Sequence, residues 1–335
     1  MNQMLPKPRF WADAAAQCKT RFSMVGEMMI LILLYLLASF TQSLILAIPM
    51  TAWIFGEQGQ TLMQSAFAGA TPQSLVIALL EKMPDWMSLV SLFAGFTMGL
   101  AAVIYCRRFQ KRDLASMGLR GPGAPGEYLL GLAVGLLCFL AVLALGVSVK
   151  GFQLGPTALS GRMLLLVLLA LLGCAVQGAS LELLLHGYFA PSLGAHYPVL
   201  IALLLSTLLP AFFQADSSLF SMSGLNSFLL ALFLGIWVLK RGNLWGACAI
   251  RGGWLFASSF LVDVAEAGTH MGIRLMDVDA DAYKPLLTGG IYGPQASICA
   301  TVVLLAAIGA ALALKPRDPA PVQEPEQNER PANFL

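Results

Sequence analysis

The sequence predicts an all-α protein, a polytopic membrane bundle of about eight transmembrane helices. Hydrophobic residues make up 58% of the 335-residue chain and charged residues only 11%, whereas soluble domains carry about 25% charged residues. The apolar residues also gather in runs of about 20, the length that crosses a bilayer. We therefore expect the lipid bilayer as the environment of the chain. The basic residues are spread through loops, so no nucleic-acid partner is predicted.

The chain begins with a polar segment of 22 residues, in which we expect an interfacial helix around Phe10 to Cys18. The apolar stretch that follows is too long for a cleaved signal, so it is interpreted as a retained first span. The eight predicted spans lie at residues 28–48, 86–105, 128–149, 163–189, 198–213, 225–239, 244–261 and 296–314. Residues 1–314 are therefore expected to form a single membrane domain.

The connections between the spans differ in composition. The segment 113–127 is rich in Gly and Pro, and an amphipathic piece is expected at residues 72–82. The long polar connection 262–293 contains the acidic run DVDAD, which we interpret as a solvated loop. The Pro-rich, polar tail 315–335 is predicted to be a disordered cytoplasmic tail.

Orientation follows from the distribution of Lys and Arg over the two sides of the eight crossings. One side, which includes both termini, receives 14 of these residues and the other side receives 5. This distribution predicts that both termini lie in the cytoplasm. The membrane itself is expected to be a bacterial inner membrane. Arg251 is left over, because the topology places it within a span.

Few polar residues are predicted at membrane depth, and they are Glu182, His186, Gln214 and Arg251. A carboxylate at that depth costs roughly 2.5 to 3.5 kcal/mol on insertion scales, so Glu182 marks a functional site and needs a partner. Glu182 and His186 are spaced i, i+4 and share one helix face. Arg251 is the simplest counter-charge. His186 is interpreted either as part of this site or as an ordinary hydrogen-bonding residue at a helix end.

Three stretches resemble the motifs of one family in order and spacing, namely LELLLHGYF, STLLPAFFQ and LWGACAIRGGWLF. They are similar to E-E-x-x-x-R-G, F-x-x-x-H and H-x-x-x-N of the CPBP intramembrane proteases, the CAAX-protease and bacteriocin-processing group. The resemblance covers about residues 118–314. For a working member it implies a helical membrane fold and a glutamate that activates water to attack a peptide carbonyl.

The chain departs from this family at most motif positions. The substituted positions are Leu181 for the first glutamate, His186 for the arginine, Pro210 and Gln214 for phenylalanine and histidine, and Arg251 and Leu255 for histidine and asparagine. Glu182 and His186 therefore remain as the catalytic candidates. A carboxylate paired with a permanent cation such as Arg251 is a poorer general base.

Three functions remain open from the sequence. The first is a catalytically impaired, pseudoprotease member that binds membrane peptides or prenylated and other lipidated proteins. The second is an active endopeptidase in which Glu182 activates water and His186 carries a proton. The third is a small-solute transporter. No metal or other cofactor is predicted, since the chain has only three histidines and a three-ligand zinc site needs several converging ligands.

Overall fold

The structure is a computed structural model that describes residues 5–18, 22–56, 59–60, 64, 84–121, 123–155, 160–214, 221–263, 273, 275–281 and 283–317. At residues 209–214, 262–263, 277, 279 and 291 it describes the backbone only. The predicted amphipathic piece at 72–82 and the tail from residue 318 onward lie outside the described residues.

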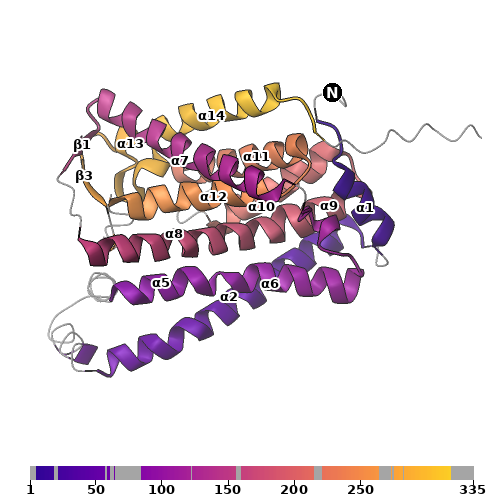
Figure 1. Cartoon of the computed structure of the whole chain (residues 1–335), viewed down its shortest axis with the longest axis horizontal. Coiled ribbons are helices and arrows are strands. Elements are labelled where there is room, and N and C mark those ends of the chain that lie inside the picture. Colours follow the sequence, from indigo (N-terminus) through magenta and orange to yellow (C-terminus); the bar gives the residue numbers. More distant parts are fainter. Residues whose placement is uncertain are drawn as a thin grey trace, which may run out of the picture.

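Helices account for almost all of the described chain (Figure 1). They are α1 (Arg9–Gln17), α2 (Met24–Ile54), α5 (Asp85–Ala94), α6 (Phe96–Tyr105), α7 (Ala124–Ser148), α8 (Gly161–Glu182), α9 (Ala190–Gly194), α10 (Val199–Gln214), α11 (Met222–Arg241), α12 (Trp245–Phe256), α13 (Pro285–Thr288) and α14 (Ile298–Ala313). Short π-helical segments are η1 (Cys106–Gln110), η3 (Leu183–Phe189) and η4 (Ala257–Leu261), and short 3-10 turns are η2 (Ala115–Met117), η5 (Gly290–Tyr292) and η6 (Pro294–Ala296).

Serine side chains fix the beginnings of four helices. Ser23, Ser160, Ser221 and Ser297 each accept a hydrogen bond from the backbone N–H three residues further on. An N-cap of this kind satisfies one of the N–H groups that the first helical turn leaves without a partner. The polar residue before each apolar run therefore decides where the helix begins.

Five helical stretches are long and apolar enough to cross a membrane, which indicates an integral membrane protein. They are Met24–Ile54, Asp85–Gln110, Ala124–Ser148, Gly161–Gly194 and Met222–Arg241. The predicted spans at 198–213, 244–261 and 296–314 form α10, α12 and α14, which are shorter. For these three helices, the crossing of the bilayer stays a prediction.

Two helices continue beyond the ends predicted from the sequence. The second span, predicted to end at residue 105, continues through the π-helical η1 to Gln110. The helix that carries Glu182 was expected to end at Phe189, and α9 extends it to Gly194. The pieces of the second helix, α8, η3 and α9, follow each other without a break, whereas a turn at Gly95 separates α5 from α6 in the first.

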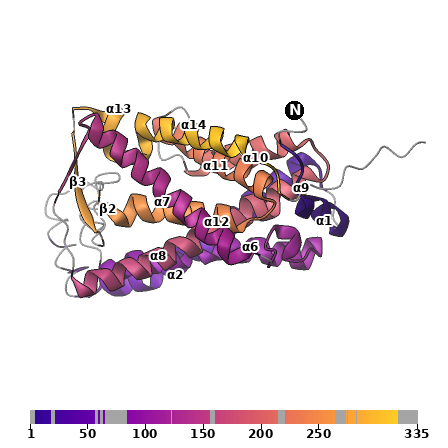
Figure 2. The same ribbon diagram turned by 45° about the horizontal axis from the view of Figure 1, so that its top comes forward.

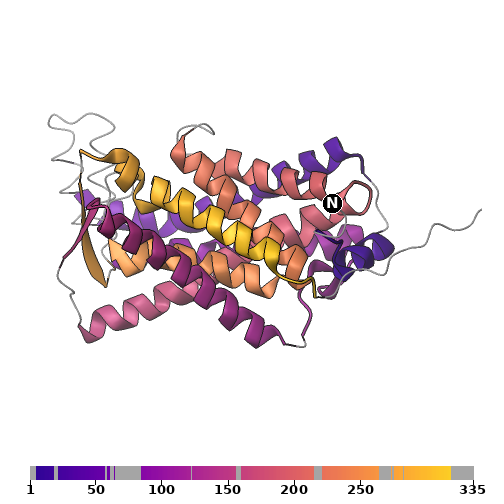
Figure 3. The same cartoon turned by 90° about the horizontal axis from the view of Figure 1, so that it is seen from above.

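The helix α12 lies at the centre of the bundle, packed against α7, α8 and α11 (Figures 1 and 2). The helices α5 and α6 pack on the other side of α8, and α2 packs on them from outside. Figure 3 shows α14, in yellow, lying along α7 and α11. Every residue of α12 except Trp245 and Leu255 is buried.

The outermost helix, α2, has the surface expected of a lipid-facing span. Large apolar side chains such as Leu33, Phe40 and Ile48 are more than half exposed. Exposed apolar side chains of this size on a long helix fit a bilayer rather than water. The buried face of α2 includes Leu31, Leu34 and Ala38.

A small sheet corrects the prediction that the acidic run DVDAD is a solvated loop. β3 (Met276–Ala280) contains the DVDA of the acidic run and pairs antiparallel with β1 (Phe152–Leu154) and parallel with β2 (Val262–Asp263). Val278 of β3 is buried beside the bundle. The sheet lies at one end of the bundle, while α1 and α9 lie at the opposite end (Figure 1).

Candidate functional site

Glu182 lies where the long helix changes from α-helical to π-helical geometry. The α8 segment ends at Glu182, and η3 follows with His186 in its middle. Segments of π-helix occur frequently at functional sites. The two side chains lie on one helix face as predicted, and they are in contact, with Nδ1 of His186 2.6 Å from Oε2 of Glu182.

The predicted counter-charge is confirmed as well. Nε of Arg251, on α12, donates a hydrogen bond of 2.5 Å to Oε1 of Glu182. Glu182 is 0% exposed, His186 is 1% exposed and Arg251 is 8% exposed. Both oxygens of the carboxylate therefore have a partner, one a permanent cation and the other an imidazole.

Glycines bring α12 close enough to its neighbours for this contact. A Cβ atom on Gly178 of α8 would lie 2.6 Å from the backbone nitrogen of Gly252, next to Arg251. On the other side, a Cβ on Gly135 of α7 would lie 2.3 Å from the carbonyl oxygen of Ile250. Small residues allow helix backbones in membranes to approach this closely. The contact between Glu182 and Arg251 thus depends on the lack of a side chain at Gly178 and Gly135.

A cavity of about 210 Å³ lies beside Arg251. Its walls come from α8, α11, α12 and η6, and they include Leu181, Leu255 and the polar side chains of Gln177, Ser223 and Asn226. Among the described residues that line the cavity, Arg251 is the only charged one. Glu182 and His186 are not among these lining residues, so only the Arg251 side of the ion pair reaches the cavity.

Two buried nitrogen atoms at this site have no hydrogen-bond partner among the described residues. They are Nη2 of Arg251 and Nε2 of His186. The backbone of Gly235 on α11 approaches the imidazole, since a Cβ there would lie 3.0 Å from Nε2. Nη2 of Arg251 is therefore a donor that Glu182 does not use. Leaving a buried donor without a hydrogen bond costs free energy.

The structure also reveals a buried arginine that the sequence did not single out. Arg112 is 2% exposed, and its Nη2 donates to the carbonyl oxygens of Gly187 (3.0 Å) and Ser116 (2.8 Å). Gly187 belongs to η3, so Arg112 holds the segment that carries His186. The sequence shows four basic residues within positions 107–112, and charge counting cannot tell the buried one from the exposed ones.

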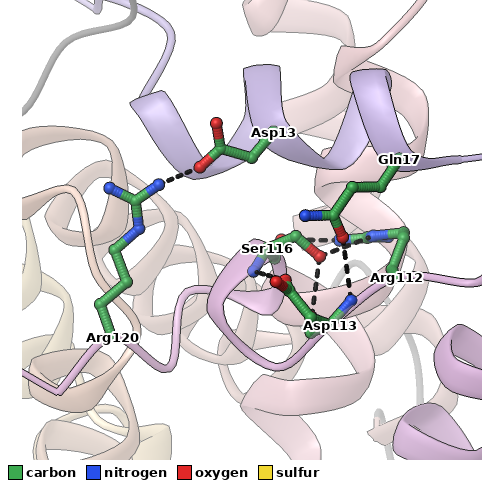
Figure 4. Close-up of polar contacts among 6 residues, drawn as sticks. All are labelled: Asp13, Gln17, Arg112, Asp113, Ser116 and Arg120. Atoms are coloured by element: carbon green, nitrogen blue, oxygen red, sulfur yellow. Dashed lines mark hydrogen bonds and ion pairs between the residues drawn. The ribbon is translucent and has the colours of Figure 1, made fainter.

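The segment around Arg112 also anchors the interfacial helix predicted near Phe10 to Cys18, which is observed as α1 (Figure 4). Asp13 forms an ion pair with Arg120, and the backbone N–H of Asp113 donates to Oε1 of Gln17 at 2.9 Å. The backbone N–H of Ser116 donates to the carboxylate of Asp113 at 2.8 Å. This hydrogen bond holds the pKa of Asp113 below its usual value.

The other substituted motif positions fall into two groups. Leu181 and Leu255 line the cavity next to Arg251. Pro210 and Gln214 lie on α10, but their side chains lie outside the described part of the structure. Among the described residues, no three His, Cys, Asp or Glu side chains gather where a metal ion could bind.

Comparisons with protein-family models, curated proteins and solved structures return no match for this chain.

Proposed function

We propose that the chain is a CPBP-type membrane protein that binds membrane peptides or lipidated proteins without cutting them. The family assignment depends on the order and spacing of the three motif stretches in the sequence. The same proposal places the protein in a bacterial inner membrane with both termini in the cytoplasm, because 14 of the 20 Lys and Arg residues fall on that side of the predicted spans.

The engagement of Glu182 is the observation that carries this proposal. Arg251 takes one carboxylate oxygen at 2.5 Å and His186 takes the other at 2.6 Å. A general base must reach the water that it activates and have a pKa near the working pH. A carboxylate that is 0% exposed and has both oxygens engaged does not reach such a water. The pair holds α8 and α12 together instead.

The composition of the cavity supports the same function. Leu181 and Leu255 line it at the positions where the resemblance would put a glutamate and an asparagine. Hydrolysis needs hydrogen-bond donors aimed at the developing oxyanion, and a leucine supplies none. The cavity therefore keeps a volume of about 210 Å³ for a ligand while two of the motif's polar groups are missing.

An assay for peptide cleavage by the purified protein in nanodiscs tests the prediction that the protein does not hydrolyse peptides. Prenylated and unprenylated peptides should remain intact over many hours, and Glu182→Gln should give the same result. Peptide cleavage that Glu182→Gln abolishes would contradict the proposal. It would support an active endopeptidase instead, for which the short contact between Glu182 and His186 is the favourable observation.

Binding of a fluorescent prenylated peptide tests the retained cavity. Ser227 lines the cavity, so Ser227→Phe should fill it and weaken binding by about tenfold or more. Leu129→Phe is the matched control, because Leu129 is 66% exposed on the surface of α7. Equal binding by both variants would mean that the peptide does not occupy this cavity.

A further inference from the structure

Arg251 has hydrogen-bonding capacity directed at no described residue. Its Nε is taken by Glu182, whereas Nη2 is buried without a partner among the described residues. The side chain is nine-tenths buried and lines the cavity. A guanidinium has five N–H donors in a fixed planar fork and suits carboxylates especially well. Glu182 accepts through Nε of Arg251, so other N–H groups of the guanidinium remain for a second acceptor.

The beginning of α11 makes the same cavity favourable for a negative charge. This 20-residue helix starts at Met222, and Ser223 in its first turn lines the cavity. The N-terminus of a helix carries a partial positive charge and N–H groups without intrahelical partners. The helix end is independent of Arg251, and both favour an anion in the same space.

No acidic side chain competes for this position among the described residues that line the cavity. Glu182 is not among these lining residues, and Leu181 and Leu255 supply apolar surface beside Arg251. Leu230 and Trp254 add more apolar surface. The cavity therefore combines one cationic group with the apolar side chains of Leu181, Leu230, Trp254 and Leu255, and its remaining side chains are polar and uncharged.

We infer that this cavity binds a carboxylate carried on an apolar chain. The carboxylate accepts hydrogen bonds from the free side of the Arg251 guanidinium, and the chain contacts Leu181, Leu255 and Trp254. The inference rests on the proposed function, and it names the chemistry that the site recognises. Two sources share this chemistry, namely a fatty acid and the free C-terminus of an apolar peptide.

Titration of the full-length protein in nanodiscs, with empty nanodiscs subtracted, tests the inference. The probes are octanoate against octanol, and acetyl-Leu-Leu with a free carboxylate against its amide. Each carboxylate should bind about tenfold more tightly than its neutral counterpart, as expected for a charge-assisted hydrogen bond. The stronger of the two carboxylates identifies the source.

Variants at Leu181 provide the matched control, because this residue lines the cavity and is not part of the ion pair. Leu181→Glu puts a carboxylate beside Arg251 and should reduce octanoate or peptide-acid binding by about tenfold or more. Leu181→Gln places an uncharged group of the same size there, so the ratio of the two affinities isolates the effect of the added charge. Equal thermal stability of the two variants shows that only the charge differs.

Three outcomes would overturn the inference: equal binding of acid and amide, equal binding by the two Leu181 variants, or no binding of any probe. Equal affinity for acid and amide would leave a peptide-binding cavity, so the proposed function would stand without the carboxylate preference. Cleavage of acetyl-Leu-Leu with the carboxylate preference intact would have the reverse effect. It would contradict the non-hydrolytic function and leave the inference standing.

Discussion

The three residues at the centre of the site illustrate how a costly carboxylate is tolerated in the bundle. Glu182, His186 and Arg251 are all buried, and the carboxylate has a partner at each oxygen. The desolvation of such a pair can equal or exceed its Coulombic attraction. The pair is therefore expected to specify how α8 and α12 meet more than to increase the total stability.

Removal of the cation alone should be strongly destabilising. Arg251→Met leaves the Glu182 carboxylate buried with no permanent counter-charge, at a cost of about 3–5 kcal/mol. A large fall in the thermal unfolding midpoint in detergent checks this expectation.

The double variant Glu182→Leu with Arg251→Met is the control, since it removes both charges and should recover most of the lost midpoint. A double variant that is as unstable as the single one would show that Arg251 stabilises the bundle by packing rather than by charge.

At the scale of elements, the approach of α12 to α7 and α8 depends on glycine. Gly252 and Gly253 of α12 permit this approach, since a Cβ on Gly253 would lie 2.9 Å from the carbonyl oxygen of Leu132. The partner glycines on α7 and α8 could not be identified from the sequence, because nothing in an apolar run indicates which face meets which helix.

Gly178→Ala should force α8 away from α12. The new Cβ would lie 2.6 Å from the backbone nitrogen of Gly252, and overpacking of this kind costs about 1–3 kcal/mol. Thermal unfolding in detergent measures the loss. Gly309→Ala on α14 is the matched control, since nothing lies within 4 Å of its added Cβ, and its midpoint should stay unchanged or rise. A similar loss in both variants would mean that helix flexibility rather than close packing is responsible.

The docking of α1 should weaken in acid. Since the N–H of Ser116 lowers the pKa of Asp113 in the folded state, the stability that Asp113 contributes is present above its unfolded pKa of about 3.9. It is lost as the pH falls through the lower folded value. Hydrogen exchange of α1, taken relative to the intrinsic exchange rate at each pH, should therefore accelerate slightly below about pH 4, and only slightly because Asp113 is exposed.

The variant Asp113→Asn distinguishes the effect of Asp113 on the pH dependence from the effects of other acidic groups that titrate in the same range. The amide oxygen can still accept from Ser116, but it has no charge to lose. The variant should show a smaller acid-induced increase in α1 exchange than the wild type. An identical increase in both proteins would assign the effect to other groups, such as the ion pair between Asp13 and Arg120.

The two ends of the whole molecule have different characters. One end carries α1, the basic cluster at 107–112 and the end of α14, while the other carries the small sheet (Figure 1). Arg317 after α14 is held at the first end, where its backbone N–H donates to Lys240 and its side chain pairs with Glu127. Both ends of the described chain therefore lie on the same side of the bundle.

Cysteine labelling in whole cells tests the predicted orientation. In a cysteine-free background, a membrane-impermeant thiol reagent should label Tyr283→Cys, since Tyr283 is 96% exposed near the sheet. Arg107→Cys, exposed at the opposite end, should react only after the cells are opened. The reverse pattern would place the basic cluster outside the cytoplasm.

The sequence by itself determined that the chain is helical and apolar, where most helices lie, that Glu182 and His186 share one face, and that Arg251 is the counter-charge. These features follow from run length, helical periodicity and the cost of a buried charge, which are properties of local sequence. Only the tertiary structure decided the pairing of β1 with β3, the burial of Arg112, the glycine contacts and the cavity beside Arg251. Each of these depends on contacts between segments far apart in the chain, and the pattern within one segment does not specify its distant partner.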